Sequence, residues 1–283
     1  MSDDVDPQTD QNMLATSMGY LRRIERDLPE LWQGATQWTD EWGSCGSYPD
    51  ARGYGSGVER VRVPPEKLAE FWRRLTTDYR ELPPITVGPL ETPGLTTWLA
   101  QYGYAAASRR RLMVLPHERL CSRTYFALHD VRVATTLNDL DQALALDQLV
   151  FDDAPLAAEQ RLAELQRITT GPRRLVLVPG EAGLARAAGL ITKRTGWALL
   201  SSGETHPDFR RQGLYRAITE RRLDVARGWG ADFVATVATP GTSEPILRRL
   251  GFLCVADITL YRPGPQRPTC HNGVGHGEAI VIG

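Results

Sequence analysis

The chain has 283 residues with 33 basic and 34 acidic side chains, so its formal net charge is −1 when histidine is neutral. A protein that binds nucleic acid by neutralising phosphates usually has an excess of Lys and Arg or a segregated basic stripe, and this sequence has neither. Hydrophobic residues make up 42% and charged residues 24% of the chain. This ordinary globular composition predicts about two domains at roughly 150 residues each.

Membrane and metal association are not expected. No apolar run approaches the roughly 20 residues that a membrane-spanning helix needs. The first 11 residues are acidic and polar, unlike a secretory signal, and favour a cytoplasmic location. The four cysteines have no CxxC spacing, which predicts reduced thiols rather than a zinc site or disulfides. The stretch with Cys270, His271, His276 and Glu278 is the weak metal candidate, and its Gly-rich context favours a mobile tail.

In the first half of the chain, apolar residues three and four positions apart predict helices over residues 13–31 and 64–82. Residues 1–12 have few apolar side chains to bury and are expected to be disordered. Residues 33–57 are rich in Gly, Ser and Trp, which predicts loops and at most short strands. The run Gly53–Gly57 could be a phosphate loop, but no strand and helix flank it properly.

The second half alternates short apolar runs with helical patterns. Three successive strand-like runs separated by turn residues predict an antiparallel meander. The expected elements are, in order, a strand at 131–135, helices at 137–151 and 161–168, strands at 175–178, 184–192 and 197–205, a helix at 212–229, a strand at 233–237, a helix at 243–250 and a strand at 253–261.

The two halves contain an internal echo. Residues 85–94, 98–104 and 111–116 match, in the same order, residues 233–241, 246–252 and 259–263. Each copy reads as a strand, a Thr-Pro-Gly turn, a short helix that ends in Gly-aromatic, and a strand. This order predicts a duplicated unit.

The segment Thr205–Ile218 lies between a predicted strand and a predicted helix. A glycine there, Gly213, allows close approach of the backbone, and the first N–H groups of the helix are unsatisfied. An anion, above all a pyrophosphate, fits such a helix end. Arg210, Arg211 and Arg216 add positive charge around the same place.

This segment resembles the acyl-CoA-binding signature of the GNAT N-acyltransferase superfamily, [Gln/Arg]-x-x-Gly-x-[Gly/Ala]. Arg210 and Gly213 fill the first and central positions, whereas Tyr215 stands where the family has a small residue. Residues 205–207, Thr-His-Pro, take the place of the family's Val-x-Pro element. The family's second landmark, a helix that ends in Leu-Gly-Phe, matches residues 246–252.

The resemblance covers residues 130–263 and implies an α/β (α+β) fold, in which helices flank a mixed, mostly antiparallel sheet splayed between its fourth and fifth strands. With the internal echo, it implies two GNAT-like domains in tandem. The first half has no Arg-x-x-Gly-x-[Gly/Ala] after a strand, so it is expected to bind no CoA. The expected domains are a disordered 1–12, a degenerate N-terminal domain at 13–118, a catalytic domain at 119–264 and a tail at 265–283.

The cofactor implied by the resemblance is acetyl-CoA, the acyl donor. Its pantetheine would pair with the backbone of residues 203–205 as an added strand would, and its pyrophosphate would lie on the N–H groups of residues 211–216. The residues expected to contact it are Gly203, Glu204, Thr205, Arg210, Arg211, Gln212, Gly213, Leu214, Tyr215, Arg216 and Ser243.

The implied reaction is direct transfer of the acetyl group to a primary amine of a small molecule or peptide within a ternary complex. A backbone N–H of the fourth strand would stabilise the oxyanion. Because amines are mostly protonated at pH 7, a base is needed. Glu204 is the first candidate and His206 the second, by virtue of its near-neutral titration. Asp152 and Asp153 border the acceptor in this family; they either attract a cationic substrate or cap a helix.

Two departures from the family leave the activity open. Leu247 stands where many members have the tyrosine that reprotonates the CoA thiolate, and Tyr215 is an alternative acid. Pro240 replaces the usual asparagine, with Ser243 as the nearest polar substitute. A catalytically degenerate acyl-CoA-binding or regulatory protein and a protein N-terminal acetyltransferase therefore remain as alternatives, and whether the chain forms a homodimer stays open. The tryptophans of the first half, Trp42 among them, either pack in a core or interface or form an aromatic wall for the acceptor.

Overall fold

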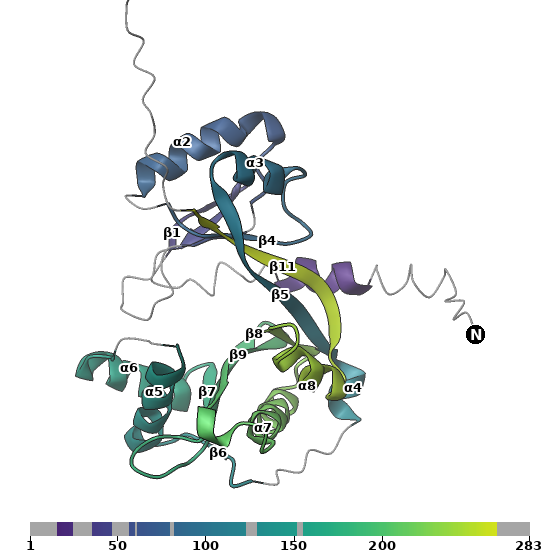
Figure 1. Ribbon diagram of the computed structural model, residues 1–283. Helices are drawn as coiled ribbons and strands as arrows, with labels where there is room; N and C mark the ends of the chain where they lie inside the picture. The colour runs from purple at the N-terminus through teal and green to yellow at the C-terminus, as the bar shows by residue number, and fades with distance from the viewer. Residues whose placement is uncertain are drawn as a thin grey trace, which may run out of the picture.

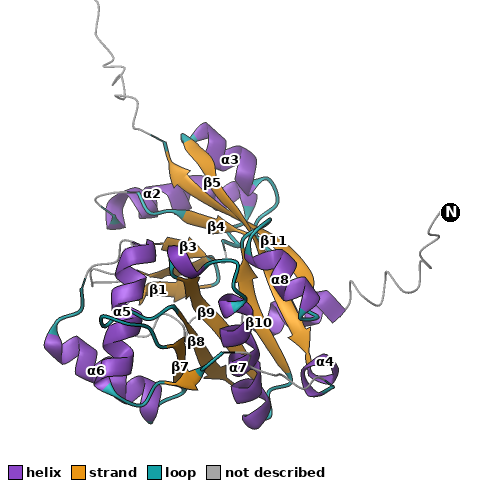
Figure 2. Ribbon diagram, turned by 60° about the horizontal axis from the view of Figure 1, so that its bottom comes forward, coloured by secondary structure: helices purple, strands orange, loops and turns teal. Residues whose placement is uncertain are grey.

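The computed structural model of the chain describes residues 16–24, 36–46, 57–59, 61–79, 82–122, 129–151 and 155–264. These residues form one 11-stranded sheet in the order β1-β2-β3-β4-β11-β5-β10-β9-β8-β7-β6, with helices on both faces (Figures 1 and 2). Among the strand pairs that the structure describes, only β3–β4 and β9–β10 are parallel. The mixed, mostly antiparallel sheet expected from the sequence is therefore confirmed.

The N-terminal half begins with a helix over residues 16–24. It continues with β1 (Thr36–Asp40), β2 (Gly43–Gly46), β3 (Gly57–Glu59), the 3-10 turn η2 (Pro65–Lys67), α2 (Leu68–Asp78), β4 (Ile85–Val87), α3 (Leu95–Gln101), β5 (Tyr104–Pro116) and α4 (His117–Cys121). The C-terminal half contains β6 (Arg132–Val133), α5 (Leu137–Phe151), α6 (Ala158–Thr169), β7 (Arg173–Val178), β8 (Ala187–Arg194), β9 (Trp197–Thr205), the 3-10 turn η3 (Pro207–Phe209), α7 (Leu214–Gly228), β10 (Phe233–Ala238), α8 (Ser243–Arg249) and β11 (Leu253–Pro263).

Most expected elements are present, with shifted ends. The predicted helix over 64–82 is preceded by the 3-10 turn η2 and ends before Tyr79. The strand expected from 184 begins at Ala187, because Ala182 and Gly183 have positive φ angles and form a turn. The strands β7, β8 and β9 form the predicted antiparallel meander. The expected disorder of 1–12 and the expected tail at 265–283 lie outside the described residues, as do Gly53 and Cys270.

Alternation along β7 shows why this sheet is covered on both faces. Leu175 and Leu177 pack into a core with α5 and α6, whereas Val176 and Val178 pack against Leu214 and other residues of α7 on the other face. Successive side chains of a strand point to opposite faces, so a continuous apolar run requires helices on both sides.

The N-terminal half has a separate core under α2 and α3. Phe71 and Leu75 of α2 and Leu99 of α3 are fully buried there. Beside them, the Trp72 and Tyr102 rings lie 4.4 Å apart and the Trp98 and Tyr102 rings 4.5 Å apart. For Trp72 and Trp98, core packing is therefore the correct interpretation.

The strand-helix-strand order predicted for both copies of the internal echo is present as β4–α3–β5 and β10–α8–β11. The two copies exchange their last strands: β5 pairs antiparallel with β10, and β11 pairs antiparallel with β4. The two long strands also pair with each other and run from one half to the other (Figure 1). The sheet is thereby continuous through both halves, and neither half contains all its own strand partners.

The N-terminal helix over residues 16–24 strengthens this connection. Leu21 and Ile24 are buried in a cluster with Trp197 and Phe233 of the C-terminal half. The Arg23 Nη2 atom also lies 2.6 Å from Oδ2 of Asp232. The first described segment therefore packs on the distant half of the chain. None of the helices in the described segments is long and apolar enough to cross a membrane.

Candidate active site

The parallel strands β9 and β10 diverge in the middle of the C-terminal half. They pair only from Ala198–Val234 to Leu200–Thr236. The Thr236 hydroxyl donates a hydrogen bond of 3.1 Å to the Leu200 carbonyl at the last paired position. Beyond it, residues 201–205 of β9 continue along β8 alone, which creates the predicted splay between the fourth and fifth strands of this half.

A β-bulge interrupts β9 at this divergence. The register between β8 and β9 passes from Leu190–Ser201 directly to Ala188–Glu204, so two residues of β9, Ser202 and Gly203, stand opposite Gly189. Ser202 has a φ of +45°, an uncommon value for a residue with a side chain. Such bulges re-aim the backbone and cluster at functional sites.

The bulge lies over a fully buried arginine. Arg222 of α7 is 1% exposed, and its Nη1 donates to the carbonyl oxygens of Leu190 (3.3 Å) and Ser201 (3.2 Å). A methyl group at Gly189 would lie 2.7 Å from this Nη1, and one at Gly203 would lie 3.1 Å from Nη2 and 3.0 Å from the Tyr215 ring. The guanidinium therefore occupies space that only glycines leave open on β8 and β9.

At the end of β9 the chain makes a turn before α7, at the place where the sequence predicts an anion site. Gly213 is the N-cap of α7 with a φ of +81°, and no side chain caps this helix end. A Cβ at this glycine would meet only His129 Nε2, at 3.7 Å. Arg210 and Arg211 are exposed beside it. The exposed N–H groups, the helix dipole and two arginines together fit a pyrophosphate.

His129 is a part of this turn that sequence reasoning missed. Its Nε2 lies 3.0 Å from the carbonyl oxygen of Gln212, and because that oxygen only accepts, the histidine donates. His129 thereby holds the residue that precedes Gly213. No motif in the sequence marked it, since the contact spans 83 positions.

Glu204, the first candidate for the base, lies at the strand end that the sequence predicted. It is 4% exposed at the end of β9. Gly203 faces α7, so strand alternation directs the Glu204 side chain to the opposite side of the sheet, which α5 covers. The carboxylate therefore lies on the side of the sheet away from α7. Thr205, the last residue of β9, pairs with Ala187.

Other expected residues have structural partners. His206 caps η3, because its Nδ1 accepts from the Asp208 N–H at 3.2 Å. The Arg216 Nε bonds Glu220 at 2.8 Å. The Ser243 hydroxyl accepts from the Thr239 N–H at 2.9 Å. His206 is therefore a weaker candidate for the base, and Ser243 caps its own turn.

The remaining expected residues are either packed in the protein or outside the described residues. Leu214 is 1% exposed, so its side chain belongs to the core and is not available to a ligand. Tyr215 packs on the bulge and hydrogen-bonds Arg222, so its ring lies against β9 rather than in the turn at Gly213. Leu247 is fully buried in the apolar core, and no ionisable group replaces the family's tyrosine at that position. Asp152 and Asp153 lie outside the described residues.

A second group that the sequence did not reveal joins the two halves at the end of β10. Glu244 of α8 is 6% exposed and is bonded by Arg248, at 2.7 Å, and by Arg111 of β5. The hydrogen bond from Arg248, followed by that from Arg111 and both positive charges, lowers the pKa of Glu244 against the opposing effect of burial. Because Arg111 comes from the N-terminal half, this ion cluster is built across the strand exchange.

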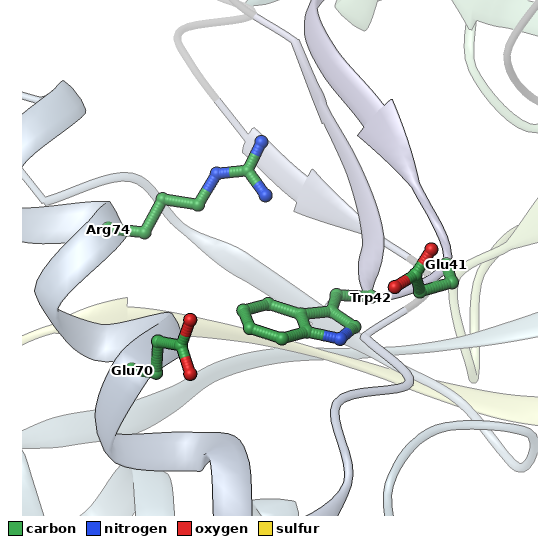
Figure 3. A pocket seen from close by; sticks show the side chains of 4 residues that line it. All are labelled: Glu41, Trp42, Glu70 and Arg74. Carbon is green, nitrogen blue, oxygen red and sulfur yellow. The ribbon is translucent and has the colours of Figure 1, made fainter.

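A shallow, open groove lies elsewhere, on the N-terminal half (Figure 3). Glu41, Trp42, Glu70 and Arg74 line it. Glu70 is bonded to Lys67 at 3.1 Å, and Arg74 lies 3.7 Å from Asp78. The groove includes Trp42, one of the tryptophans considered for an acceptor wall, but none of the residues expected to bind acetyl-CoA or to act as the base. Glu41 lies in the turn between β1 and β2.

Comparisons with known proteins show the fold. No protein-family model and no curated relative match the sequence. Among solved structures, the chain is similar to a GCN5-related N-acetyltransferase from Kribbella flavida, with a TM-score of 0.64 and 21% identity over 86% of this chain and 95% of that one. It is also similar to a GCN5-related N-acetyltransferase from Sphaerobacter thermophilus (TM-score 0.53, 14% identity, 80% and 79% covered). A tandem GNAT protein from the clavulanic acid biosynthesis pathway, solved without AcCoA, gives a TM-score of 0.52 with 16% identity and 80% of each chain covered.

The chain therefore has the GNAT fold, as the resemblance predicted. The structures named here are described as N-acetyltransferases, and at 14–21% identity the likeness shows the fold. The residues present also fit the donor that this fold implies. The β9 edge that β10 leaves unpaired leads directly to the uncapped end of α7 at Gly213.

Proposed function

We propose that this protein is an acetyl-CoA-dependent N-acetyltransferase that acts on a primary amine of a small molecule or peptide by direct transfer in a ternary complex. The observation that carries the proposal is the continuity of two features. The unpaired edge of β9, residues 201–205, runs into an exposed, uncapped helix N-terminus with Gly213 at its cap. An extended acyl carrier with a pyrophosphate needs a strand edge and an anion site in this order.

Acetyl-CoA supplies the acetyl group as an activated thioester. The backbone of residues 203–205 is proposed to pair with its pantetheine. The N–H groups of residues 211–216, with Arg210 and Arg211, are proposed to hold its pyrophosphate. Gln212 and Leu214 are proposed to contribute their backbone N–H groups. Ser243, whose hydroxyl is engaged by Thr239, is a peripheral contact at most.

Glu204 is the proposed base. Its carboxylate lies at the end of β9 beside the divergence and is largely shielded from solvent. Removal of a proton from the incoming amine requires an acceptor within hydrogen-bond reach, directly or through one water. Among the family's usual positions, the one for a general acid is filled by Leu247. We therefore propose that the thiolate leaves without a dedicated tyrosine.

We propose that residues 13–118 form a degenerate GNAT-like domain and residues 119–264 the catalytic one. The similarity to a tandem GNAT protein and the duplicated β-α-β unit support this division. The loop between α5 and α6, with Asp152 and Asp153, is the proposed acceptor border.

A second candidate is a catalytically silent acyl-CoA-binding protein, which Leu247 favours. The two functions are separated by turnover: release of free thiol from acetyl-CoA is measured against a panel of primary amines and short peptides. We expect acceptor-dependent release. Binding of acetyl-CoA by calorimetry without release for any amine would support the regulatory alternative, and release only with peptide N-termini would identify a protein N-terminal acetyltransferase.

A further inference from the structure

Arg222 is an unusual residue for the interior of a protein. It lies on the apolar stripe of α7, four residues after the buried Ile218, and is 1% exposed. A buried charge is costly unless it is fully hydrogen-bonded. Within the described residues no carboxylate is paired with it. Its bonds go to neutral oxygens instead: Nε to Ile218 O (3.3 Å), Nη2 to Thr219 Oγ1 (3.1 Å), and Nη1 to Leu190 O and Ser201 O.

The contact with Ser201 determines the direction of one peptide group. The peptide between Ser201 and Ser202 is trans, and in a trans peptide the C=O and N–H bonds point in opposite directions. Because Arg222 holds the Ser201 carbonyl on the α7 side, the Ser202 N–H points away from α7. At this position β10 no longer pairs with β9. The N–H group therefore faces the divergence, on the same side of the sheet as Glu204.

The same contact alters the strength of this donor. A cation bonded to a peptide carbonyl polarises the whole amide, and linked hydrogen bonds strengthen one another in a low-dielectric interior. Burial lowers the pKa of the guanidinium, and the hydrogen bond with Tyr215 raises it. Tyr215 thus helps to keep the cation against the bulge. The two glycines, Gly189 and Gly203, allow the guanidinium to come this close.

We infer that Arg222 is a positioning residue for acyl transfer: it holds the Ser201–Ser202 peptide so that the Ser202 N–H donates to the carbonyl oxygen of the bound thioester. The inference rests on the proposed function, since it assigns a part to a site that acetyl-CoA must occupy. It explains three features together, namely a buried arginine without a carboxylate, a left-handed Ser202, and glycines on both strands under the guanidinium.

The test uses the full chain and acetyl-CoA labelled with carbon-13 at the thioester carbonyl. Calorimetry first establishes that the wild-type protein binds acetyl-CoA. Isotope-edited infrared spectroscopy then measures the carbonyl stretch of the bound molecule, which falls in frequency when the oxygen accepts a hydrogen bond. We expect a lower frequency on the wild-type protein than in water, and loss of most of that shift in Arg222→Gln. With a working acceptor, kcat should fall roughly 10- to 100-fold, with a KM for acetyl-CoA within about threefold of wild type.

Two further variants separate positioning from folding. In Gly189→Ala the added methyl would lie 2.7 Å from Nη1 and displace the guanidinium without removing it. It should reproduce the spectral change, and it decides the question if Arg222→Gln does not fold. Arg221→Gln removes a positive charge from the neighbouring, partly exposed position on α7 and should leave the carbonyl frequency at its wild-type value.

The outcomes are distinct. A wild-type protein that does not bind acetyl-CoA overturns the proposed function and this inference with it. Binding with the same carbonyl frequency in wild type, Arg222→Gln and Gly189→Ala overturns this inference alone. A frequency that changes equally in Arg221→Gln overturns it as well, because the effect would then follow net charge rather than the contact with Ser201.

Discussion

The two connections from a strand to the following helix, β3–α2 and β9–α7, have the same topology and opposite chemistry. Each begins a crossover that joins two parallel strands, β3 to β4 and β9 to β10. After β9 the chain is exposed and leads to the N-terminus of α7, where Gly213 is the N-cap and no side chain caps the helix. After β3, Val61 and Val63 are buried and their carbonyl oxygens both accept from the Thr92 hydroxyl. The backbone of the connection after β3 is therefore buried in the core of the N-terminal half.

The residues at the helix start complete the contrast. Pro64 and Pro65 begin the 3-10 turn before α2, and proline has no N–H to donate. A strand-turn-helix connection can therefore bind an anion only when its backbone donors remain available. No side chain caps the N-terminus of α7. The comparison predicts one acetyl-CoA site per chain, in the C-terminal half.

The strongest way to break the comparison is to separate the two halves. Deletion of residues 1–118 removes β5 from between β10 and β11, together with the helix that carries Leu21 and Ile24. We expect residues 119–264 alone to aggregate and to show no cooperative thermal transition by circular dichroism. A fragment that begins at residue 102 retains β5 and should recover solubility. A cooperatively folded 119–264 fragment would show that the exchanged strand is dispensable.

The next largest effect concerns the anion turn. Gly213→Glu places bulk and negative charge where the pyrophosphate is proposed to lie, so acetyl-CoA affinity should fall more than about 100-fold by calorimetry, roughly 3 kcal/mol. Gly94→Glu is the matched control, because Gly94 is also a helix N-cap with a φ of +79° and open space around it. It should carry the same backbone strain and bind acetyl-CoA normally. A calorimetric titration that finds two equivalent acetyl-CoA sites per wild-type chain would contradict the assignment of one site at Gly213.

A smaller effect is expected at the proposed base. Glu204→Gln should lower kcat by roughly 100-fold at neutral pH with little change in the KM for acetyl-CoA, because it removes proton transfer and leaves donor binding. Glu164→Gln is the control, since Glu164 is a carboxylate of similar burial on α6, bonded to Arg167 and Arg173. A loss below about threefold in Glu204→Gln would assign the proton to another group.

The smallest effect tests the ion cluster that joins the halves. The pKa of Glu244 is lowered in the folded state, so the ionised carboxylate stabilises the fold at neutral pH and loses this contribution as pH falls through the folded pKa. The melting temperature of wild type should therefore exceed that of Glu244→Gln at pH 7, and the difference should shrink towards about pH 3. A difference that stays constant over this range would indicate that the charge of Glu244 is irrelevant to stability.

Several parts of the site were predictable because their signals are local. Arg210 and Gly213 are three residues apart in the sequence, and the turn that they mark needs only its own backbone and the following helix. The meander and the β-α-β echo depend on short-range periodicity and turn residues in the same way. One further signal was present: Arg222 interrupts the apolar spacing of Leu214 and Ile218, as a charged residue on a core-facing stripe.

The sequence by itself therefore indicated the turn at Gly213, the chain order of the helices and strands in the C-terminal half and the two β-α-β units. Only the tertiary structure decided that β5 and β11 are exchanged between the repeats, that Arg111 reaches Glu244, and that Arg222 lies under the bulge of β9. These features depend on which distant strands pair and in what register. Two antiparallel strands of similar composition satisfy their backbone hydrogen bonds equally well within a repeat or between repeats. The choice is made by the packing of whole faces, which no local pattern contains.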